Sequence, residues 1–342
     1  MPPSNSWIRL QPLSEASDNA AEIALTMSLD NRGLAYGDGF FTTMGVIDGL
    51  ILWSDYHQQR LDSHADALQL DIDSQALLAT LQTQAKQLQQ GMLKLIVTRA
   101  AQDVRGYGYA PSTSGSACEV WLKSSAMPIA TAEQLRLPNG RLVPVQPVAS
   151  ATCLSSQLAC LPPPLAGLKS LNRLDNVLAS AELQRVKAQI LKSNPFLPAN
   201  HLSSNHLSAS AEPNIGEGLL RDMSGHWVEG TMSNVFYQLS ESPFAKSSNP
   251  PHLQNNSNYL STGQWYTPSM AQSGVAGVMR QVLIDGLSTT EQPVIIRSLS
   301  DKDLPHLSQL FFCNALRGIM PMSSLKLLSG EVVGFKSQKN IG

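Results

Sequence analysis

The stretch PPPLAGLKSLNRLDNVLAS, residues 162–180, carries the strongest local signal for the fold of this chain. Gly167 and Leu168 close a proline-rich loop, and apolar residues at helical spacing predict a helix that begins at Asn172. Lys169 therefore stands on short, stiff backbone just before a helix. An amine that is positioned and partly removed from water suits Schiff-base chemistry. Position alone favours a plain surface turn, so the rest of the sequence has to decide.

The composition excludes several classes of protein. The 342 residues are enough for two domains with a full hydrophobic core. A net charge of −2 and an isoelectric point near 6.4 give no basis for binding nucleic acid or an anionic membrane. No apolar run reaches the length of a membrane span, and the first residues lack the pattern of a signal peptide. We therefore expect a cytoplasmic protein.

Cysteine and histidine residues indicate neither disulfides nor a metal site. The four cysteines show no disulfide pattern and no metal-ligand spacing. Three histidines fall in two segments rich in Ser, Asn and Pro, at about residues 193–213 and 240–263, which we interpret as surface insertions. Such segments are usually solvated, so we expect no metal there. The sequence does not indicate what the insertions do.

Strand and helix patterns predict an α+β protein of two domains, a smaller one of residues 1–127 and a larger one of residues 128–342. A Gly-Asp-Gly turn at residues 37–39 precedes a strand predicted over 40–46. These glycines do not form a dinucleotide-binding fingerprint, because that motif needs a helix after it and a strand follows here.

Four features of the sequence fit one cofactor site when they are taken together. Lys169 offers an amine, and Glu229 offers an acid at the end of an apolar strand. Arg60 offers a guanidinium, and small residues near Gly277 open a helix whose free N–H groups can bind an anion. Pyridoxal phosphate needs an amine for its aldehyde, an acid for its ring nitrogen, and a guanidinium with backbone amides for its phosphate.

Seven segments resemble, in order, the fold type IV pyridoxal-phosphate enzymes and, among them, the 4-amino-4-deoxychorismate lyases. The segments are YGDGFFTT (36–43), HQQRL (57–61), GMLKLIVTRAAQDVRGYGY (91–109), GLKSLNRLDNVLAS (167–180), WVEGTMSNVF (227–236), TPSMAQSGVAGVMRQ (267–281) and CNALRGIMPM (313–322). They cover nearly the whole chain apart from the two insertions, which makes the resemblance specific. It implies two domains of mixed sheets with flanking helices, the cofactor at the domain interface, and a homodimer.

The resemblance also implies roles for individual residues. Lys169 corresponds to the lysine that binds the cofactor, and Glu229 to the acid on the pyridine nitrogen. The residues expected to hold the phosphate are Arg60, the turn Gly277, Val278 and Met279, and a second loop at Asn314 and Ala315. Related aminotransferases usually carry Gly-Thr at that second loop, so a hydroxyl contact is expected to be missing here.

Three differences favour the lyases over their aminotransferase relatives. Thr42 follows GDGFF where branched-chain aminotransferases typically have Glu, LNR follows Lys169, and CNAL (313–316) replaces a loop of small residues. Two departures from the lyase pattern, Arg317-Gly318 and Met322, concern local substrate contacts rather than the cofactor site.

The implied reaction converts 4-amino-4-deoxychorismate, a small molecule, to 4-aminobenzoate and pyruvate in folate biosynthesis. Lys169 would act as the catalytic base, with Thr42 or Thr43 facing the cofactor or assisting protonation. The expected substrate contacts are Arg105, Tyr107 and Asn314.

Two other functions remain open at this point. The first is a D-amino-acid or branched-chain aminotransferase that uses the same pyridoxal-phosphate site. The second is a non-enzymatic cofactor-binding or scaffold protein, which the presence of both Lys169 and Glu229 disfavours.

Overall fold

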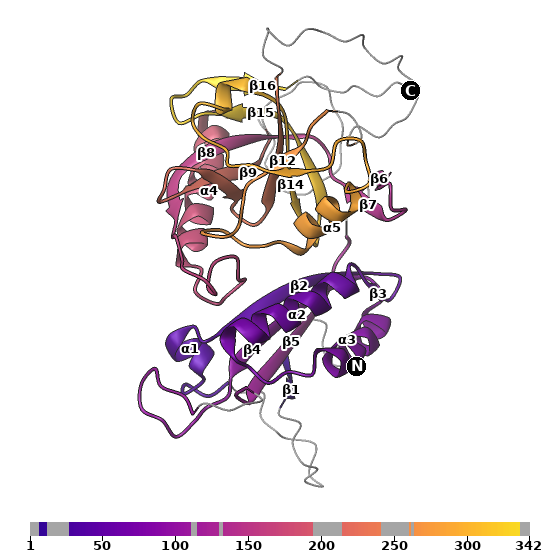
Figure 1. Ribbon diagram of the computed structural model, residues 1–342, viewed down its shortest axis with the longest axis vertical. Coiled ribbons are helices and arrows are strands. Elements are labelled where there is room, and N and C mark those ends of the chain that lie inside the picture. Colours follow the sequence, from indigo (N-terminus) through magenta and orange to yellow (C-terminus); the bar gives the residue numbers. More distant parts are fainter. Residues whose placement is uncertain are drawn as a thin grey trace.

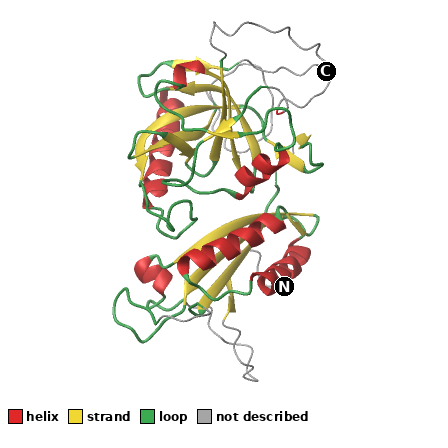
Figure 2. Ribbon diagram, viewed as in Figure 1, coloured by secondary structure: helices red, strands yellow, loops and turns green. Residues whose placement is uncertain are grey.

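A computed structural model of the chain describes residues 7–11, 27–110, 115–129, 133–193, 214–240, 260 and 263–335. These residues form two halves, each built around its own β-sheet (Figure 1). The first sheet uses strands up to Ala126, and the second begins at Glu133. Helices lie against both sheets (Figure 2), so the expected α+β class is confirmed. The two expected insertions, at about 193–213 and 240–263, fall almost wholly outside the described residues.

The first half is an antiparallel sheet in the order β1-β5-β4-β2-β3. Its strands are β1 (Trp7–Gln11), β2 (Gly39–Ile47), β3 (Leu50–Ile51), β4 (Gly91–Arg99) and β5 (Cys118–Ala126). Its helices are α1 (Arg32–Tyr36), α2 (Ser54–Leu68) and α3 (Ser74–Leu88). Fully buried Phe40, Leu61 and Leu81 belong to one core between the sheet and α2 and α3. The other face of β2 is therefore left to the second half.

The second half contains the remaining elements. Its strands are β6 (Glu133–Arg136), β7 (Leu142–Val145), β8 (Ala149–Leu158), β9 (Ile215–Asp222), β10 (Trp227–Gly230), β11 (Asn234–Leu239), β12 (Tyr266–Thr267), β13 (Ile295–Ile296), β14 (Leu307–Asn314), β15 (Gly318–Lys326) and β16 (Val332–Gly334). Its helices are α4 (Leu174–Ser193), α5 (Val278–Gly286) and the short 3-10 helix η2 (Leu304–His306).

Six of these strands close a ring. The pairs run β8-β9-β10-β11-β14-β15, and β15 returns to pair with β8 in parallel. Side chains that alternate along the strands fill the inside, where Trp227, Tyr237 and Phe312 are buried. A closed ring leaves few free strand edges, which makes it a rigid support for a site.

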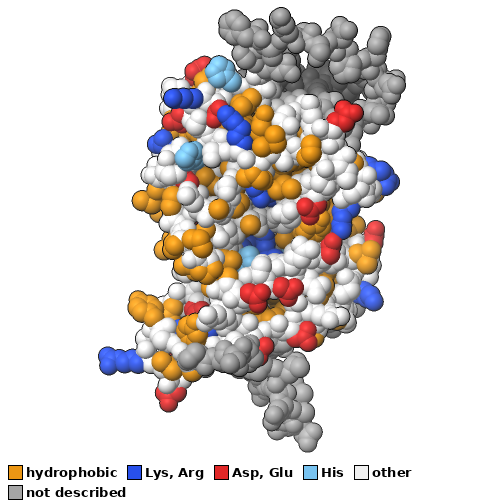
Figure 3. Space-filling view, in the orientation of Figure 1, with side chains coloured by type: hydrophobic (Ala, Val, Ile, Leu, Met, Phe, Trp, Pro, Cys, Tyr) orange, Lys and Arg blue, Asp and Glu red, His pale blue; other side chains and the backbone are white. Residues whose placement is uncertain are grey.

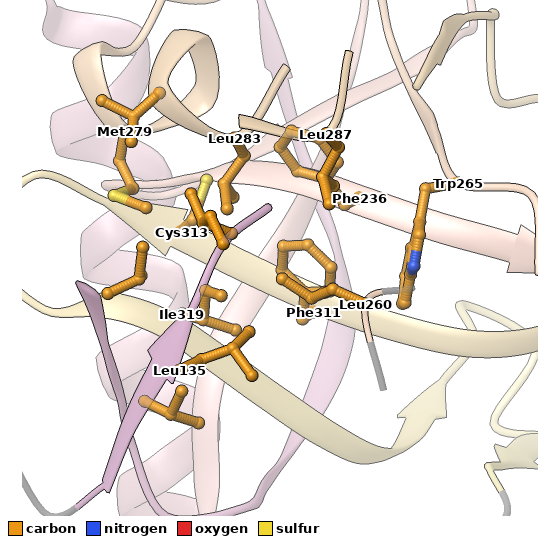
Figure 4. Packing of buried hydrophobic residues seen from close by; sticks show 14 of the residues in the cluster. Leu135, Phe236, Leu260, Trp265, Met279, Leu283, Leu287, Phe311, Cys313 and Ile319 are labelled. Carbon is orange, nitrogen blue, oxygen red and sulfur yellow. The ribbon is translucent and has the colours of Figure 1, made fainter. Parts of the chain in front are cut away.

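Helix α5 packs on the outside of this ring (Figure 4). Phe236 and Phe311 stack with their ring centroids 5.0 Å apart, and Trp265 meets the Phe311 ring edge-on at 4.7 Å. Trp53 and Tyr56 of α2 join the same cluster, and the Tyr56 hydroxyl donates to Asp285 of α5 at 3.0 Å. This shared core fixes the first half against the second.

Helix α4 differs from its expected form in two ways. It begins at Leu174 rather than at Asn172. Its periodic apolar residues Leu174 and Leu178 are 77% and 63% exposed, whereas Leu183 is buried against β8 and β9. Apolar residues lie on two sides of this helix, so spacing predicted the helix but not the side that faces the sheet.

None of the helices in the described ranges is long and apolar enough to cross a membrane.

Glu182 ties α4 to the end of β8. Its carboxylate accepts hydrogen bonds from the backbone N–H and the hydroxyl of both Ser155 and Ser156, at 2.6–2.9 Å. Partial burial acts to raise the pKa of Glu182, but these hydrogen bonds outweigh it and lower the pKa to about 2.

We predict that Glu182→Gln lowers the free energy of unfolding by about 1–2 kcal/mol near neutral pH, because one amide cannot accept all these bonds. The pKa in the folded state lies below that of the unfolded chain, so this stabilisation is present above about pH 4.3 and is lost as the pH falls toward 2. Urea unfolding at about pH 7 and about pH 3 measures the difference, with exposed Glu291→Gln as the control. An equal loss at both pH values would contradict the assignment.

Candidate active site

Lys169 lies where the two halves meet, on the loop before α4. Its backbone N–H donates to Nε2 of His64 in α2 at 2.9 Å. Its carbonyl accepts from the N–H of Phe41 in β2 at 3.0 Å. The amine lies 4.5 Å from the centroid of the Phe41 ring. Both backbone groups are thus bound to the first half, which fixes the direction of the side chain.

The surroundings of Lys169 favour its neutral form. Burial is the main cause that lowers the pKa of the amine, and the positive charges of Arg60, Arg173 and Lys94 add to it. Glu229 acts in the opposite direction, and the resulting pKa is about 8. About a tenth of the amine is therefore unprotonated and nucleophilic at pH 7, and about half at pH 8.

Glu229, at the end of β10, is the buried carboxylate of the site and is 3% exposed. Its Oε2 accepts a hydrogen bond from the backbone N–H of Val275 at 2.8 Å. The side-chain amides of Asn176 and Asn234 lie at 3.4 and 3.5 Å from its oxygens. Burial raises the pKa of Glu229 to about 7, although Arg173 and these hydrogen bonds act to lower it.

The loop of residues 273–277 brings its backbone against Glu229. Gly274 has φ +77°, and a Cβ there would lie 3.0 Å from Oε2 of Glu229, so both conformation and space require glycine. The hydroxyl of Ser273 donates to Asp222 at 2.7 Å. The amide of Asn234 donates to the Val275 carbonyl at 2.8 Å. These bonds hold the Val275 N–H in place for the carboxylate.

Arg60 lies beside the start of α5, and together they offer hydrogen-bond donors to an anion. Nη2 of Arg60 donates to the carbonyl of Ala276 at 2.7 Å, directly before the N-cap Gly277. Gly277 makes no side-chain capping bond, so the N–H groups of Val278 and Met279 have no intrahelical acceptor. Burial lowers the pKa of Arg60 to about 10, which leaves the guanidinium charged at neutral pH.

Positive charge exceeds negative charge in this site. The guanidinium groups of Arg60 and Arg173 donate to carbonyl and hydroxyl oxygens and to no carboxylate of the described residues. Glu229 is the acid that acts on Lys169. A phosphate at the start of α5 would supply the missing negative charge, and an aldehyde-bearing pyridine would use the amine and the acid. The residues therefore fit pyridoxal phosphate.

A metal-based site has no support in the described parts of the chain. No group of three or more His, Cys, Asp or Glu side chains is placed there to bind a metal ion.

Thr42 and Thr43 lie on opposite faces of β2. Thr42 is fully buried, and its hydroxyl lies 3.0 Å from Nδ1 of His57 and 3.5 Å from Arg60. Burial, with Arg60, holds the pKa of His57 well below its usual value. Thr42 thus supports Arg60 from the core side. Thr43 is half-buried, on the same face as Phe41 and therefore on the side of Lys169.

The loop after β14 is shaped by Asn314. Its Oδ1 accepts from the N–H groups of Leu316 and Arg317 at 3.1 and 2.8 Å. The carbonyl of Ala315 accepts from Nε1 of Trp53 at 3.3 Å. The contacts of Asn314 and Ala315 with cofactor or substrate stay predictions.

Arg105 and Tyr107 lie on an exposed loop beside α1. The carbonyl of Tyr107 accepts from the Arg32 guanidinium at 3.0 Å, and its ring packs on Tyr36 with centroids 5.2 Å apart. Tyr107 is 83% exposed. In the described residues of this chain, no contact joins this loop to Lys169.

Lys94 and Arg173 belong to the site although the sequence analysis did not assign them. Lys94 in β4 pairs with Thr43, and its amine lies 5.4 Å from the Phe41 ring centroid. The alternation of β4 could have indicated this, because Lys94 stands between buried Leu93 and Leu95. Arg173 stands in the LNR motif after Lys169, but the motif did not indicate where its side chain would bind, because one of the two carbonyls it contacts lies far away in the sequence.

Known proteins share sequence and fold with this chain. A family model described as amino-transferase class IV matches residues 39–193 and 198–325. The aminodeoxychorismate lyase of Vibrio harveyi is 22% identical over 305 residues, which are 89% of this chain and 89% of that protein.

Solved structures share the fold. The crystal structure of 4-amino-4-deoxychorismate lyase from Pseudomonas aeruginosa has a TM-score of 0.64 and 28% identity, and covers 92% of each chain. A hypothetical aminotransferase from Mycobacterium tuberculosis, in a PLP-bound form, has a TM-score of 0.59 and 17% identity, and covers 92% of this chain and 90% of that one. The expected fold is confirmed.

Because its pKa is lowered, the Lys169 amine should lose its proton at a lower pH than an ordinary lysine does. We expect reductive methylation of the cofactor-free protein to modify Lys169 with a rate that rises through about pH 8, because only the neutral amine reacts. Peptide mass spectrometry after short exposures across the pH range measures this rate. A Lys169 rate that rises only near the ordinary lysine value of about 10.4 would show that the amine is solvated.

Proposed function

The chain belongs to the amino-transferase class IV family, and we propose that it is an aminodeoxychorismate lyase. It would convert 4-amino-4-deoxychorismate to 4-aminobenzoate and pyruvate with pyridoxal phosphate as cofactor, a step toward folate that we place in the cytoplasm. The observation that carries the proposal is the buried set of an amine, an acid and an anion site at the junction of the two halves. Similarity to the lyases of V. harveyi and P. aeruginosa supports the lyase over an aminotransferase.

Each residue of the set has a part in holding the cofactor. Lys169 would bind its aldehyde, Glu229 its ring nitrogen, and Arg60 with the first N–H groups of α5 its phosphate. When bound, pyridoxal phosphate supplies an electron-withdrawing ring that makes a proton on the attached carbon easier to remove.

Groups on the Lys169 side of β2 would transfer protons during the reaction. With a pKa of about 8, the Lys169 amine can take the C4 proton of the substrate near neutral pH. Thr43 is the better placed of the two threonines to assist, because Thr42 is turned to the core. Loss of the enolpyruvyl group as pyruvate then leaves an aromatic ring, and this aromatisation drives the reaction.

Lys94 offers a cation for a substrate carboxylate. It lies across from Thr43 on the same face of the first sheet, and no ion pair is recorded for it in the described structure. An ammonium next to the reacting amine both attracts an anionic substrate and keeps Lys169 neutral.

We predict that the purified protein, loaded with pyridoxal phosphate, releases pyruvate from 4-amino-4-deoxychorismate without a second substrate. Lys169→Ala should abolish both this turnover and the near-visible absorbance of the bound cofactor, since both need the amine. Pyruvate is measured with a coupled lactate dehydrogenase assay. Transfer of an amino group to a keto acid, with no pyruvate from the chorismate, would establish the aminotransferase instead.

We also propose that the protein is a homodimer. Helices α1 and α4 lie on the same side of the two halves (Figure 1), and apolar atoms are visible along this edge (Figure 3). Exposed apolar residues occur in these helices and in the loops beside them. The residues are Leu34, Tyr107, Leu165, Leu174, Val177 and Leu178. An apolar surface that spans two halves is typical of a protein–protein interface. A substrate role for Arg105 and Tyr107 would then require the loop of a second copy.

We predict that Leu178→Asp shifts the protein toward a monomer, because it places a charge in that apolar surface. Sedimentation velocity at micromolar concentration measures the shift. Leu328→Asp, in the turn between β15 and β16, changes another exposed leucine and serves as the matched control. A monomeric wild-type protein, or an unchanged dimer in the Leu178 variant, would refute this surface as the interface.

A further inference from the structure

We propose that Arg173 is a positioning residue that holds the Lys169 amine and the Glu229 carboxylate at a fixed spacing and keeps both groups in their reactive charge states. The inference rests on the proposed cofactor chemistry and names a residue for which that chemistry assigned no part.

The first observation is that Arg173 joins the two backbone segments that carry the reactive groups. Nη2 of Arg173 donates to the carbonyl of Leu168, which is the peptide directly before Lys169. The same nitrogen donates to the carbonyl of Gly274 at 3.0 Å, which is the peptide directly before Val275. The N–H of Val275 in turn donates to Glu229 at 2.8 Å. One guanidinium nitrogen therefore links the backbone next to Lys169 with the backbone next to Val275, whose N–H donates to Glu229.

The two segments run side by side over a short distance. Gly167 and Val275 form a parallel bridge, and the N–H of Ala276 donates to the Gly167 carbonyl at 2.9 Å. This backbone pairing attaches the two segments to each other near Gly167. The contacts of Arg173 add a second point of attachment on the side of Glu229, and two points fix the spacing.

The second observation concerns charge. A nearby cation lowers the pKa of a carboxyl group and of an amine alike, so it favours an ionised acid and a neutral amine. Arg173 is the strongest of the influences that lower the pKa of Glu229, and it also lowers the pKa of Lys169. These are the states that the chemistry needs: a carboxylate for the ring nitrogen and a free amine for the aldehyde.

Arg173 differs from the other cations near Lys169 and Glu229, because it lowers the pKa of both groups. Arg60 of α2 and Lys94 of β4 act on Lys169, whereas the charges acting on Glu229 are those of Arg173 and Lys169. His64 of α2 also faces Arg173, and burial lowers its pKa to about 3, so it is neutral at working pH.

The hydrogen bonding of Arg173 leaves Glu229 available. Its recorded bonds go to carbonyl oxygens, not to the carboxylate, so the acid stays open to a ligand. Nε of Arg173 is buried with no hydrogen-bond partner in the described structure. An unpartnered buried donor costs stability, so this arginine is not fully satisfied by the bonds it makes within the described structure.

The test compares wild type with Arg173→Gln and Arg173→Lys. Binding of pyridoxal phosphate to the cofactor-free proteins is followed by absorbance between about pH 5 and pH 10, and thermal unfolding checks that each variant is folded. Titration of the ligand itself is the same for every variant, so it cancels in the ratio of dissociation constants. Arg185→Gln, which replaces an exposed arginine in α4, is the matched control.

With Arg173→Gln we expect the acid side of the binding profile to move up by about one pH unit, which weakens binding about tenfold below neutral pH. Arg173→Lys keeps the charge but lacks the planar fork, so its profile should stay at the wild-type pH with weaker binding throughout. An unmoved profile in Arg173→Gln, or an equal displacement in Arg173→Lys, overturns the proposal.

Two results separate this proposal from the proposed function. Should Arg173→Gln not fold, Arg173→Lys decides alone, because a displacement of one pH unit in that variant would show that charge is not the cause. Wild-type protein that binds the cofactor but releases no pyruvate would end the lyase assignment and leave the binding comparison valid.

Discussion

The site depends on keeping a lysine amine and a carboxylate buried near each other without a direct bond. A buried charge without a partner destabilises a protein, and the structure avoids this in different ways for Glu229 and for Lys169. Glu229 receives the N–H of Val275 and two amides, whereas Lys169 is turned toward its neutral form by burial and by neighbouring cations. The loop of residues 273–277 makes this possible, since only a glycine at position 274 lets the backbone lie against the acid. A ligand that bridges the two groups and carries a phosphate completes the balance.

This arrangement exists only at the junction of the two halves. The first half supplies the Phe41 ring under the amine, the His64 acceptor for the Lys169 backbone, and Arg60. The second half supplies the lysine, the acid and the start of α5. Basic side chains are visible at the boundary between the halves in Figure 3. Because each half holds only part of the set, the core that Trp53 and Tyr56 share with α5 is also a condition for activity.

The outer surface of the same region bears on substrate recognition. Helix α4 starts five residues after Lys169 and has exposed apolar side chains at Leu174 and Leu178. The loop with Tyr107 lies on the same side of the molecule, beside α1 (Figure 1). Association of two copies over this side would cover the apolar surface and bring a second loop toward the site. Dimerisation and substrate binding would then be linked.

Local sequence patterns predicted β2, α4 and α5, because strand composition and helical spacing are properties of short segments. Family-like motifs also identified Lys169, Glu229, Arg60 and Gly277, which the structure brings together, because these residues stand in characteristic stretches.

The sequence by itself thus determined several elements and the candidate residues of the site. Only the tertiary structure decided that Thr42 faces the core, that Leu178 of α4 faces outward, and that Arg173 links Lys169 to Glu229. The physical reason is that burial, proton affinity and long-range hydrogen bonds depend on which distant segments meet. Arg173 meets a carbonyl 101 residues further along the chain, and no pattern within either segment records that contact.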